Sequence, residues 1–208
     1  MNNYQKNVEI NAQDVFLVSG GYRSLKVFQI IRLIQDITLR FTMLYIPHYS
    51  RTRDQMEQAA RSGKQNIAEG SVDAATSSKM EINLYNIARG SLEELKNDYE
   101  DYLRINNAIQ WDNNHPFAKE FIARRINSNR QFREFIAWAE AHSQTAKSHA
   151  VPLKSVLVAN GTILLINVAT FWLTKLNYKK MQLLLKYGGF SEKIVVARLK
   201  QRSNQAKS

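Results

Sequence analysis

The chain has 208 residues, 44% of them hydrophobic, and a formal net charge of +11 at pH 7. Such a length supports one main domain, and the few prolines and glycines leave room for long helices. Cysteine is absent, which excludes disulfides, thiolate nucleophiles and cysteine-ligated metal centres. The polar segment Met1 to Gln13 lacks the apolar run of a secretory signal, so we expect a cytoplasmic protein.

The first expected helix begins near Ser24. Its apolar side chains recur at alternating spacings of three and four residues, the pattern of helices that pack in bundles. These side chains are Val27, Ile30, Ile34, Ile37, Phe41 and Leu44. Pro47 and the polar residues after it then interrupt the pattern. The sequence therefore predicts that the first helix ends there.

A second helix is expected from the capping box formed by Thr52 and Gln55. Small residues mark its buried face, among them Ala60 and Gly63, so this helix can approach its neighbours closely. Gly70 supplies a C-terminal stop. We interpret Asn66 and Glu69, beside the small-residue face, as structural residues that satisfy partners within the bundle.

Two further helices complete the expected bundle. The third begins at a capping box of Ser78 and Glu81 and carries an apolar stripe from Leu84 to Tyr102. Pro116 suits the first turn of a fourth helix that runs to Ala139. Four helices with short connections predict an all-α, antiparallel up-down-up-down four-helix bundle.

A long uncharged segment, Val156 to Thr174, follows a polar linker. It is long enough to cross a bilayer, but Asn160, Asn167 and Thr174 recur every seven residues and form one polar stripe. A helix buried against protein is favoured, and a membrane span or a hairpin at Asn160-Gly161 remain alternatives. The expected organisation is an N-terminal extension (1–21), a bundle (22–142), a linker (143–155) and a helical basic suffix (156–208).

Two stretches carry a family resemblance. They are Gln55 to Gly70, reading QMEQAARSGKQNIAEG, and Asn83 to Leu95, reading NLYNIARGSLEEL. They resemble the signature stretches of four-helix-bundle proteins first noticed as products of intervening sequences in bacterial large-subunit ribosomal RNA genes. DYEDYLR at Asp98 to Arg104 is similar to a subgroup with a C-terminal suffix domain. The motif positions singled out as structural are Gln55, Asn66, Glu69, Gly70, Gly90, Ser91 and Glu94.

The resemblance implies a cytoplasmic homo-oligomer, commonly a pentamer, without catalytic activity. One branch, the accessory variability determinant of diversity-generating retroelements, is similar in fold, binds nucleic acid through a basic surface and assists a reverse transcriptase. The chain departs from the shorter members at Glu57-Gln58, where they commonly carry a basic pair. Their surface charge at that point therefore does not carry over.

Enzymatic signatures are not found in the sequence. The histidines His48, His115, His142 and His149 lack metal-ligand spacing, and no Glu-x-x-His occurs. No glycine-rich loop matches a phosphate-binding or dinucleotide-binding fingerprint. We therefore expect no enzyme, no metal and no cofactor.

The basic charge is concentrated at one end of the chain. Residues 175–208 carry nine basic side chains and one acidic, against 20 basic and 17 acidic in residues 1–174. An uncompensated positive field attracts polyanions, so we expect RNA or DNA as a partner. The candidate phosphate contacts are Arg51, Arg53, Arg61, Lys64, Lys179, Lys180, Arg198, Lys200 and Arg202. The alternatives are a protein-interaction scaffold without nucleic-acid binding, in which the tail only solubilises the protein, and a membrane-attached bundle.

Overall fold

The structure, a computed structural model, describes residues 21–143 and 151–205. The predicted N-terminal extension and part of the predicted linker, residues 1–20 and 144–150, lie outside the described residues. Within the described ranges every regular element is a helix, which confirms the all-α prediction. The elements are the 3₁₀ helix η1 (Gly21–Ser24) and the α-helices α2 (Lys26–Tyr45), α3 (Arg51–Asp73), α4 (Ser78–Ile105), α5 (Pro116–Arg124), α6 (Asn129–His142), α7 (Leu153–Tyr187) and α8 (Phe190–Gln205).

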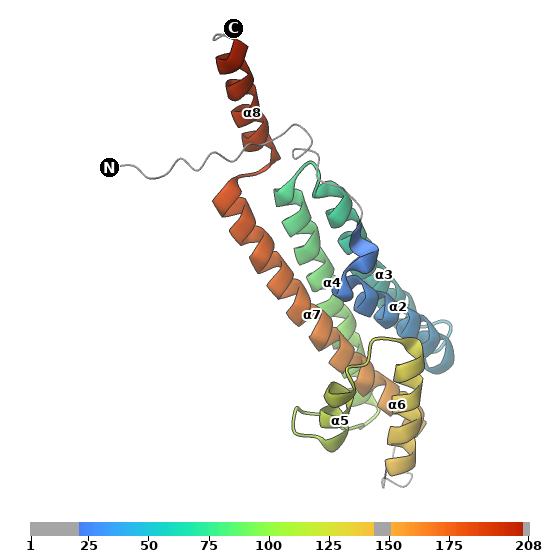
Figure 1. The fold of residues 1–208 in the computed structure, drawn as a ribbon. Coiled ribbons are helices and arrows are strands. Elements are labelled where there is room, and N and C mark those ends of the chain that lie inside the picture. The colour runs from blue at the N-terminus through green and yellow to red at the C-terminus, as the bar shows by residue number, and fades with distance from the viewer. Residues whose placement is uncertain (1–20, 144–150, 206–208) are drawn as a thin grey trace.

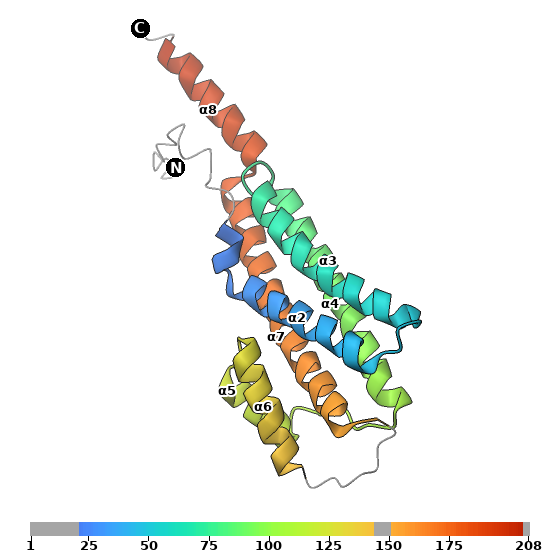
Figure 2. The ribbon, with the colours of Figure 1, turned by 90° about the vertical axis from the view of Figure 1, so that its right-hand side faces the viewer.

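Four long helices, α2, α3, α4 and α7, lie side by side and share one core (Figures 1 and 2). α3 packs on α2 and α4, and α7 packs on the same two helices. Their inward faces bury large side chains completely, including Ile34, Leu95, Tyr99 and Leu165. α2, α3 and α4 each bury one apolar face, whereas the first half of α7 is buried on most sides.

The expected fourth helix is interrupted, so the predicted up-down-up-down bundle of residues 22–142 is not confirmed. Helix α5 ends at Arg124, and the next residue, Arg125, has a φ of 49° and a ψ of 48°, which place it in the left-handed region. Ser128 then caps α6 by accepting a hydrogen bond from the backbone N–H of Gln131. The two short helices lie against the N-terminal part of α7. The long helix that closes the core is thus α7, which the sequence placed in the suffix.

Residues 156–174 lie inside α7, so the hairpin alternative at Asn160-Gly161 is wrong. By length and composition α7 could cross a membrane, a test that the core helices of soluble proteins also pass. In this structure 72% of its most apolar window is buried against the other helices. Most side chains of this window are therefore packed against protein, whereas Phe171 and Trp172 remain exposed.

Asn160 lies in the buried half of α7 and joins it to the loop that precedes α5. Its side-chain oxygen accepts a hydrogen bond from the N–H of Trp111 at 2.7 Å. Its amide nitrogen donates to the carbonyl oxygens of Ile109 and Val156, both at 3.1 Å. Asn167 and Thr174, the later members of the expected polar stripe, are exposed. Asn160 at one end of the stripe is therefore buried and hydrogen-bonded, whereas Asn167 and Thr174 are exposed to solvent.

Candidate functional site

The predicted basic residues of α3 do not form one patch. Arg51 and Arg61 are exposed. The Nε of Arg53 lies 3.1 Å from Oε1 of Glu57, so its charge is paired one turn along the helix. Lys64 is half-buried and lines a cavity on the other side of the helix from Arg51. The four residues therefore face different surroundings.

The predicted tail residues also divide. Lys179 is exposed, and Arg198 and Arg202 are exposed on α8, which extends beyond the end of the long helices (Figure 1). The backbone of Lys200 is part of α8, while its side chain lies outside the described atoms. Lys180 differs from the others, because its Nζ lies 2.7 Å from Oε1 of the buried Glu81. Its ammonium group is engaged within the fold.

The outer half of α7 carries a surface of exposed aromatic and basic side chains, which we call the α7 surface. It consists of Phe171, Trp172, Lys175, Tyr178, Lys179 and Lys186. The exposed fractions of Phe171, Trp172 and Tyr178 are 53%, 44% and 68%. The Nζ of Lys175 lies 4.5 Å from the ring centroid of Phe171 and 5.9 Å from that of Trp172. The rings and the cations are thus neighbours on one helix and are open to solvent.

Only part of the α7 surface was predicted from the sequence. Lys179 was predicted as a phosphate contact, whereas Phe171 and Trp172 read as buried because they belong to an apolar run. The spacing of the residues carried a signal for this surface. Phe171, Lys175 and Tyr178 recur at intervals of four and three residues, which puts their side chains on one helical face.

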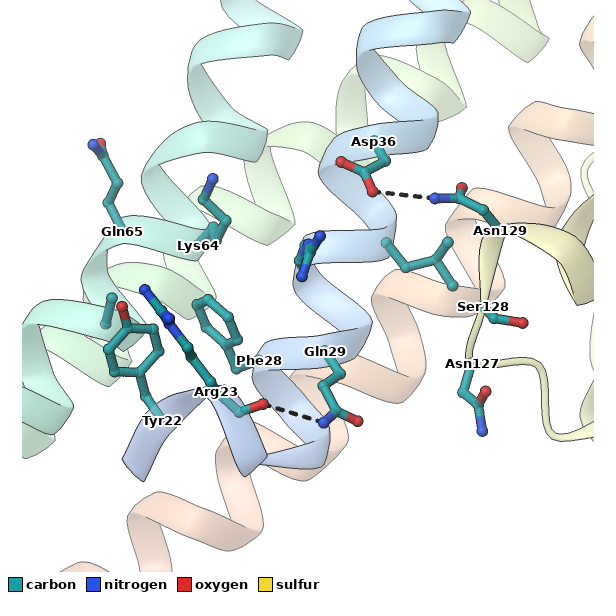
Figure 3. A pocket seen from close by; sticks show the side chains of 13 residues that line it. Tyr22, Arg23, Phe28, Gln29, Asp36, Lys64, Gln65, Asn127, Ser128 and Asn129 are labelled. Atoms are coloured by element: carbon teal, nitrogen blue, oxygen red, sulfur yellow. Dashed lines mark hydrogen bonds between the residues drawn. The ribbon is translucent and has the colours of Figure 1, made fainter. Parts of the chain in front are cut away.

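A cavity of about 670 Å³ lies over the exposed side of α2. Arg32 and Asp36 of α2 form part of its lining. Figure 3 shows Arg23 of η1 and Lys64 of α3 on one side of this helix, and Asn127 and Asn129 of the α5–α6 turn on the other. We call it the α2 cavity. The break between α5 and α6 creates it, because the turn approaches α2 at this point.

The α2 cavity has an excess of positive charge. Arg23, Arg32 and Lys64 line it, and within the described part of the chain none of them forms an ion pair. The only carboxylate in the lining, Asp36, accepts a hydrogen bond from the amide of Asn129 at 3.1 Å. The sequence predicted Lys64 alone of these residues, because the others come from three separate segments and form no motif.

The signature residues of the two motif stretches meet in a groove between α3 and α4. Gln55, Ser91 and Glu94 line this groove. The hydroxyl oxygens of Ser62 and Ser91 are 2.9 Å apart across the two helices. The amide of Asn66 donates to the carbonyl oxygen of Ser62 at 2.9 Å and to its hydroxyl oxygen at 3.1 Å. The contact between Ser62 and Ser91 joins α3 to α4, whereas both bonds of Asn66 lie within α3.

The remaining motif residues have different environments. Gly70 is buried inside α3, which continues to Asp73, so the predicted C-terminal stop at Gly70 is wrong. A Cβ added at Gly70 would lie 2.8 Å from a ring carbon of Tyr85. Gly90 is exposed, with no neighbouring atom in reach of an added Cβ. Glu69 is also exposed. Close packing thus explains Gly70, while nothing in the structure explains a glycine at position 90.

Asp98 lines the same α3–α4 groove at the end that carries most of the acidic side chains. Partial burial, together with the nearby charges of Asp101 and Glu94, raises the pKa of its carboxyl group. Among the described residues no three histidine, aspartate or glutamate side chains are grouped so as to hold a metal ion.

Comparison with protein-family models, with curated proteins and with solved structures gives no match to this chain. The resemblance of the two motif stretches accordingly stays a prediction from the sequence.

Proposed function

We propose that the chain is a non-enzymatic, nucleic-acid-associated accessory protein that binds phosphate backbones through basic surfaces. The observation that carries this proposal is the α7 surface, where exposed rings alternate with lysines. Its lysines, Lys175, Lys179 and Lys186, form no ion pair among the described residues.

Such a surface offers both interactions that a single strand of RNA or DNA requires. Lysines contact phosphates and release condensed counterions. Exposed rings stack on bases with little regard to sequence, a contribution of about 1–3 kcal/mol per base. Phe171, Trp172 and Tyr178 expose enough of their rings for such stacking. Lys180 is left out of the proposed contacts, because Glu81 holds its charge.

The motif resemblance extends the proposal to assembly and location. We propose a cytoplasmic homo-oligomer, a pentamer by analogy with the family, in which the long helices form the family's bundle with α7 as fourth helix. A closed ring of subunits presents several copies of the α7 surface. Several weak contacts on one assembly bind a nucleic-acid strand more tightly than a single contact does. The same analogy proposes a reverse transcriptase as the protein that this chain assists.

The test compares two triple variants that lose the same charge. Lys175, Lys179 and Lys186 are replaced by Gln in the first, and the control replaces Lys26, Lys79 and Lys119, which are exposed on other helices. Binding of a single-stranded oligonucleotide is titrated at several salt concentrations. The α7 variant should bind more weakly, and its salt slope should fall by about 0.7 per lost phosphate contact. The control should retain the wild-type slope.

The proposal fails if the wild type has no affinity for nucleic acid at physiological salt, or if the two variants behave alike. Oligomeric state must be matched by sedimentation velocity before the slopes are compared, since a ring multiplies the number of contacts.

A protein-interaction scaffold is the second candidate, and the exposed apolar side chains at the same end of the molecule favour it. Leu185, Val195 and Leu199 have exposed fractions of 74%, 53% and 59%. Large exposed apolar side chains in one region are typical of an interaction site. Replacing Leu185 and Leu199 by Ser separates the candidates: loss of self-association or partner binding with nucleic-acid affinity intact supports the scaffold.

A further inference from the structure

The α2 cavity is separate from the α7 surface and has a different chemistry. Its volume of about 670 Å³ lies within the usual range of small-ligand sites, about 300–1,000 Å³. Such sites are mostly apolar, whereas the exposed lining here is more polar than apolar. The occupant it suits is therefore a polar molecule of modest size.

The charges of the lining specify an anion. Arg23, Arg32 and Lys64 place three positive charges around one concavity, and the described residues provide no ion-pair partner for any of them. Positive charges that line one concavity create a positive potential there, and this potential attracts an anion. Asp36 brings one negative charge against these three positive charges, so the lining keeps an excess of positive charge.

The donor types favour phosphate over a carboxylate. Two guanidinium groups and one ammonium offer more charged N–H donors than the two oxygens of a carboxylate can accept. Three phosphate oxygens match such a set, and guanidinium groups bind them in the forked geometry. The side chains of Arg23 and Lys64 lie on the same side of α2 in Figure 3, and both line the cavity.

The rest of the lining suits a base and its sugar. The amides of Gln65 and Asn127 can both donate and accept hydrogen bonds, as the edge of a base requires. Tyr22 adds an aromatic ring, which packs edge-on against Phe28 with centroids 4.8 Å apart. The guanidinium carbon of Arg23 lies 5.8 Å from the centroid of the Tyr22 ring.

We propose that the α2 cavity binds a nucleotide through its phosphate monoester, with Arg23, Arg32 and Lys64 as phosphate ligands. Two sources share this chemistry: a free nucleoside monophosphate and the 5′-phosphorylated end of a polynucleotide. The site does not depend on the α7 surface, so the two proposals can fail separately.

Calorimetric titration of the full chain, in a buffer free of phosphate, tests the site with AMP and with adenosine. AMP should bind, and adenosine should bind at least about tenfold more weakly, because it lacks the phosphate that accepts the charged hydrogen bonds. A trinucleotide with a 5′-phosphate is compared with its 5′-hydroxyl form in the same way. Preference for the 5′-phosphate without AMP binding identifies the polynucleotide end as the source.

Arg32→Gln and Lys64→Gln should each reduce the affinity for the phosphorylated ligand about tenfold or more. Arg40→Gln is the matched control: it removes an exposed arginine of α2 that does not line the cavity. The α7 triple variant should keep full affinity for the phosphorylated ligand. Thermal melting of each variant establishes that it folds, and using two substitutions guards against one of them unfolding the chain.

Three results would overturn the proposal. The first is equal affinity for the phosphorylated and unphosphorylated forms of both ligands. The second is the absence of binding by either phosphorylated ligand. The third is a loss of affinity in Arg40→Gln as large as that in the cavity variants, which would show only a general dependence on net charge.

Discussion

Lys180 of α7 places its Nζ 2.7 Å from Oε1 of Glu81, a carboxylate of α4 that is only 3% exposed. The hydroxyl of Tyr85 donates to the same oxygen at 3.0 Å. Burial and the charge of Glu81 raise the pKa of Tyr85, so its hydroxyl keeps the proton that it donates. This cluster ties the outer half of α7 to α4.

Lys180→Gln should therefore destabilise the fold, because it leaves a buried carboxylate without its counter-charge. We expect a loss of about 1–3 kcal/mol in the free energy of unfolding. Urea unfolding at pH 7 measures this loss. Lys179→Gln is the neighbouring control, and its exposed side chain should change stability by less than about 0.5 kcal/mol. Equal effects of the two variants would contradict a structural role for the Lys180 pair.

Gly63→Leu should disrupt packing between α3 and α4. A Cβ at this buried position would already lie 3.3 Å from Cδ2 of Leu92, so a larger side chain forces the helices apart. The expected loss is about 1–3 kcal/mol or more, measured as a lower melting temperature. Gly90→Ala is the contrasting variant on α4, with open space around the added Cβ. It should gain about 0.5–1 kcal/mol, and a loss there would show that the open space is filled by a partner.

Asp98→Asn should stabilise the protein at neutral pH. A carboxyl group whose pKa is raised by folding contributes stability below its unfolded pKa, and this contribution is lost as pH rises through the folded pKa. The substitution removes that penalty, so the variant should exceed the wild type at pH 7 and match it at about pH 3. Glu93→Gln, at an exposed site on the same helix, serves as the control. A difference that does not change with pH would rule out titration of Asp98 as its cause.

Asn160→Ala should loosen the loop between α4 and α5. The substitution leaves the N–H of Trp111 and the carbonyl oxygen of Ile109 without the partner they have in the fold. We expect a loss of about 1–3 kcal/mol and faster hydrogen exchange at the amide of Trp111. Asn167→Ala, exposed on the same helix, should stay within about 0.5 kcal/mol of the wild type. Unchanged exchange at Trp111 would show that the loop is held by other contacts.

Periodicity in the sequence was sufficient to predict the helices of the core. Ile30, Ile34 and Phe41 were predicted to face inward and are buried. Leu44, at the end of the same stripe, is half-exposed because its helix ends at Tyr45. The starts of α3 and α4 were predicted to within one or two residues. The predicted capping boxes at Thr52 and Ser78 are wrong, because the side chains of Ser50 and Ser77 cap these helices.

The interruption between α5 and α6 was missed although the sequence held a signal for it. Ser128 and Gln131 form a capping box, in which the side chain of Gln131 accepts from the N–H of Asn127 and from the hydroxyl of Ser128. The apolar stripe continues across the break, and this continuity led to the prediction of one helix.

Pairings between distant segments could not be predicted. Lys180 belongs to a strongly basic tail, and only the packing of α7 on α4 brings it to Glu81. The α2 cavity similarly joins η1, α2, α3 and the α5–α6 turn. Local patterns in one sequence specify helical faces, while such long-range partners depend on how the helices assemble.

The position of α7 in the core has a consequence for the order of folding. α2, α3 and α4 emerge from the ribosome first, and their apolar faces cannot be fully covered until α7 has been synthesised. During that interval the nascent chain exposes a hydrophobic groove between α2 and α4, a condition that favours chaperone binding and aggregation. Contacts of α7 with α2 also have large sequence separation, which slows the final closure relative to a bundle of consecutive helices. The core is therefore covered only after the ribosome has synthesised α7.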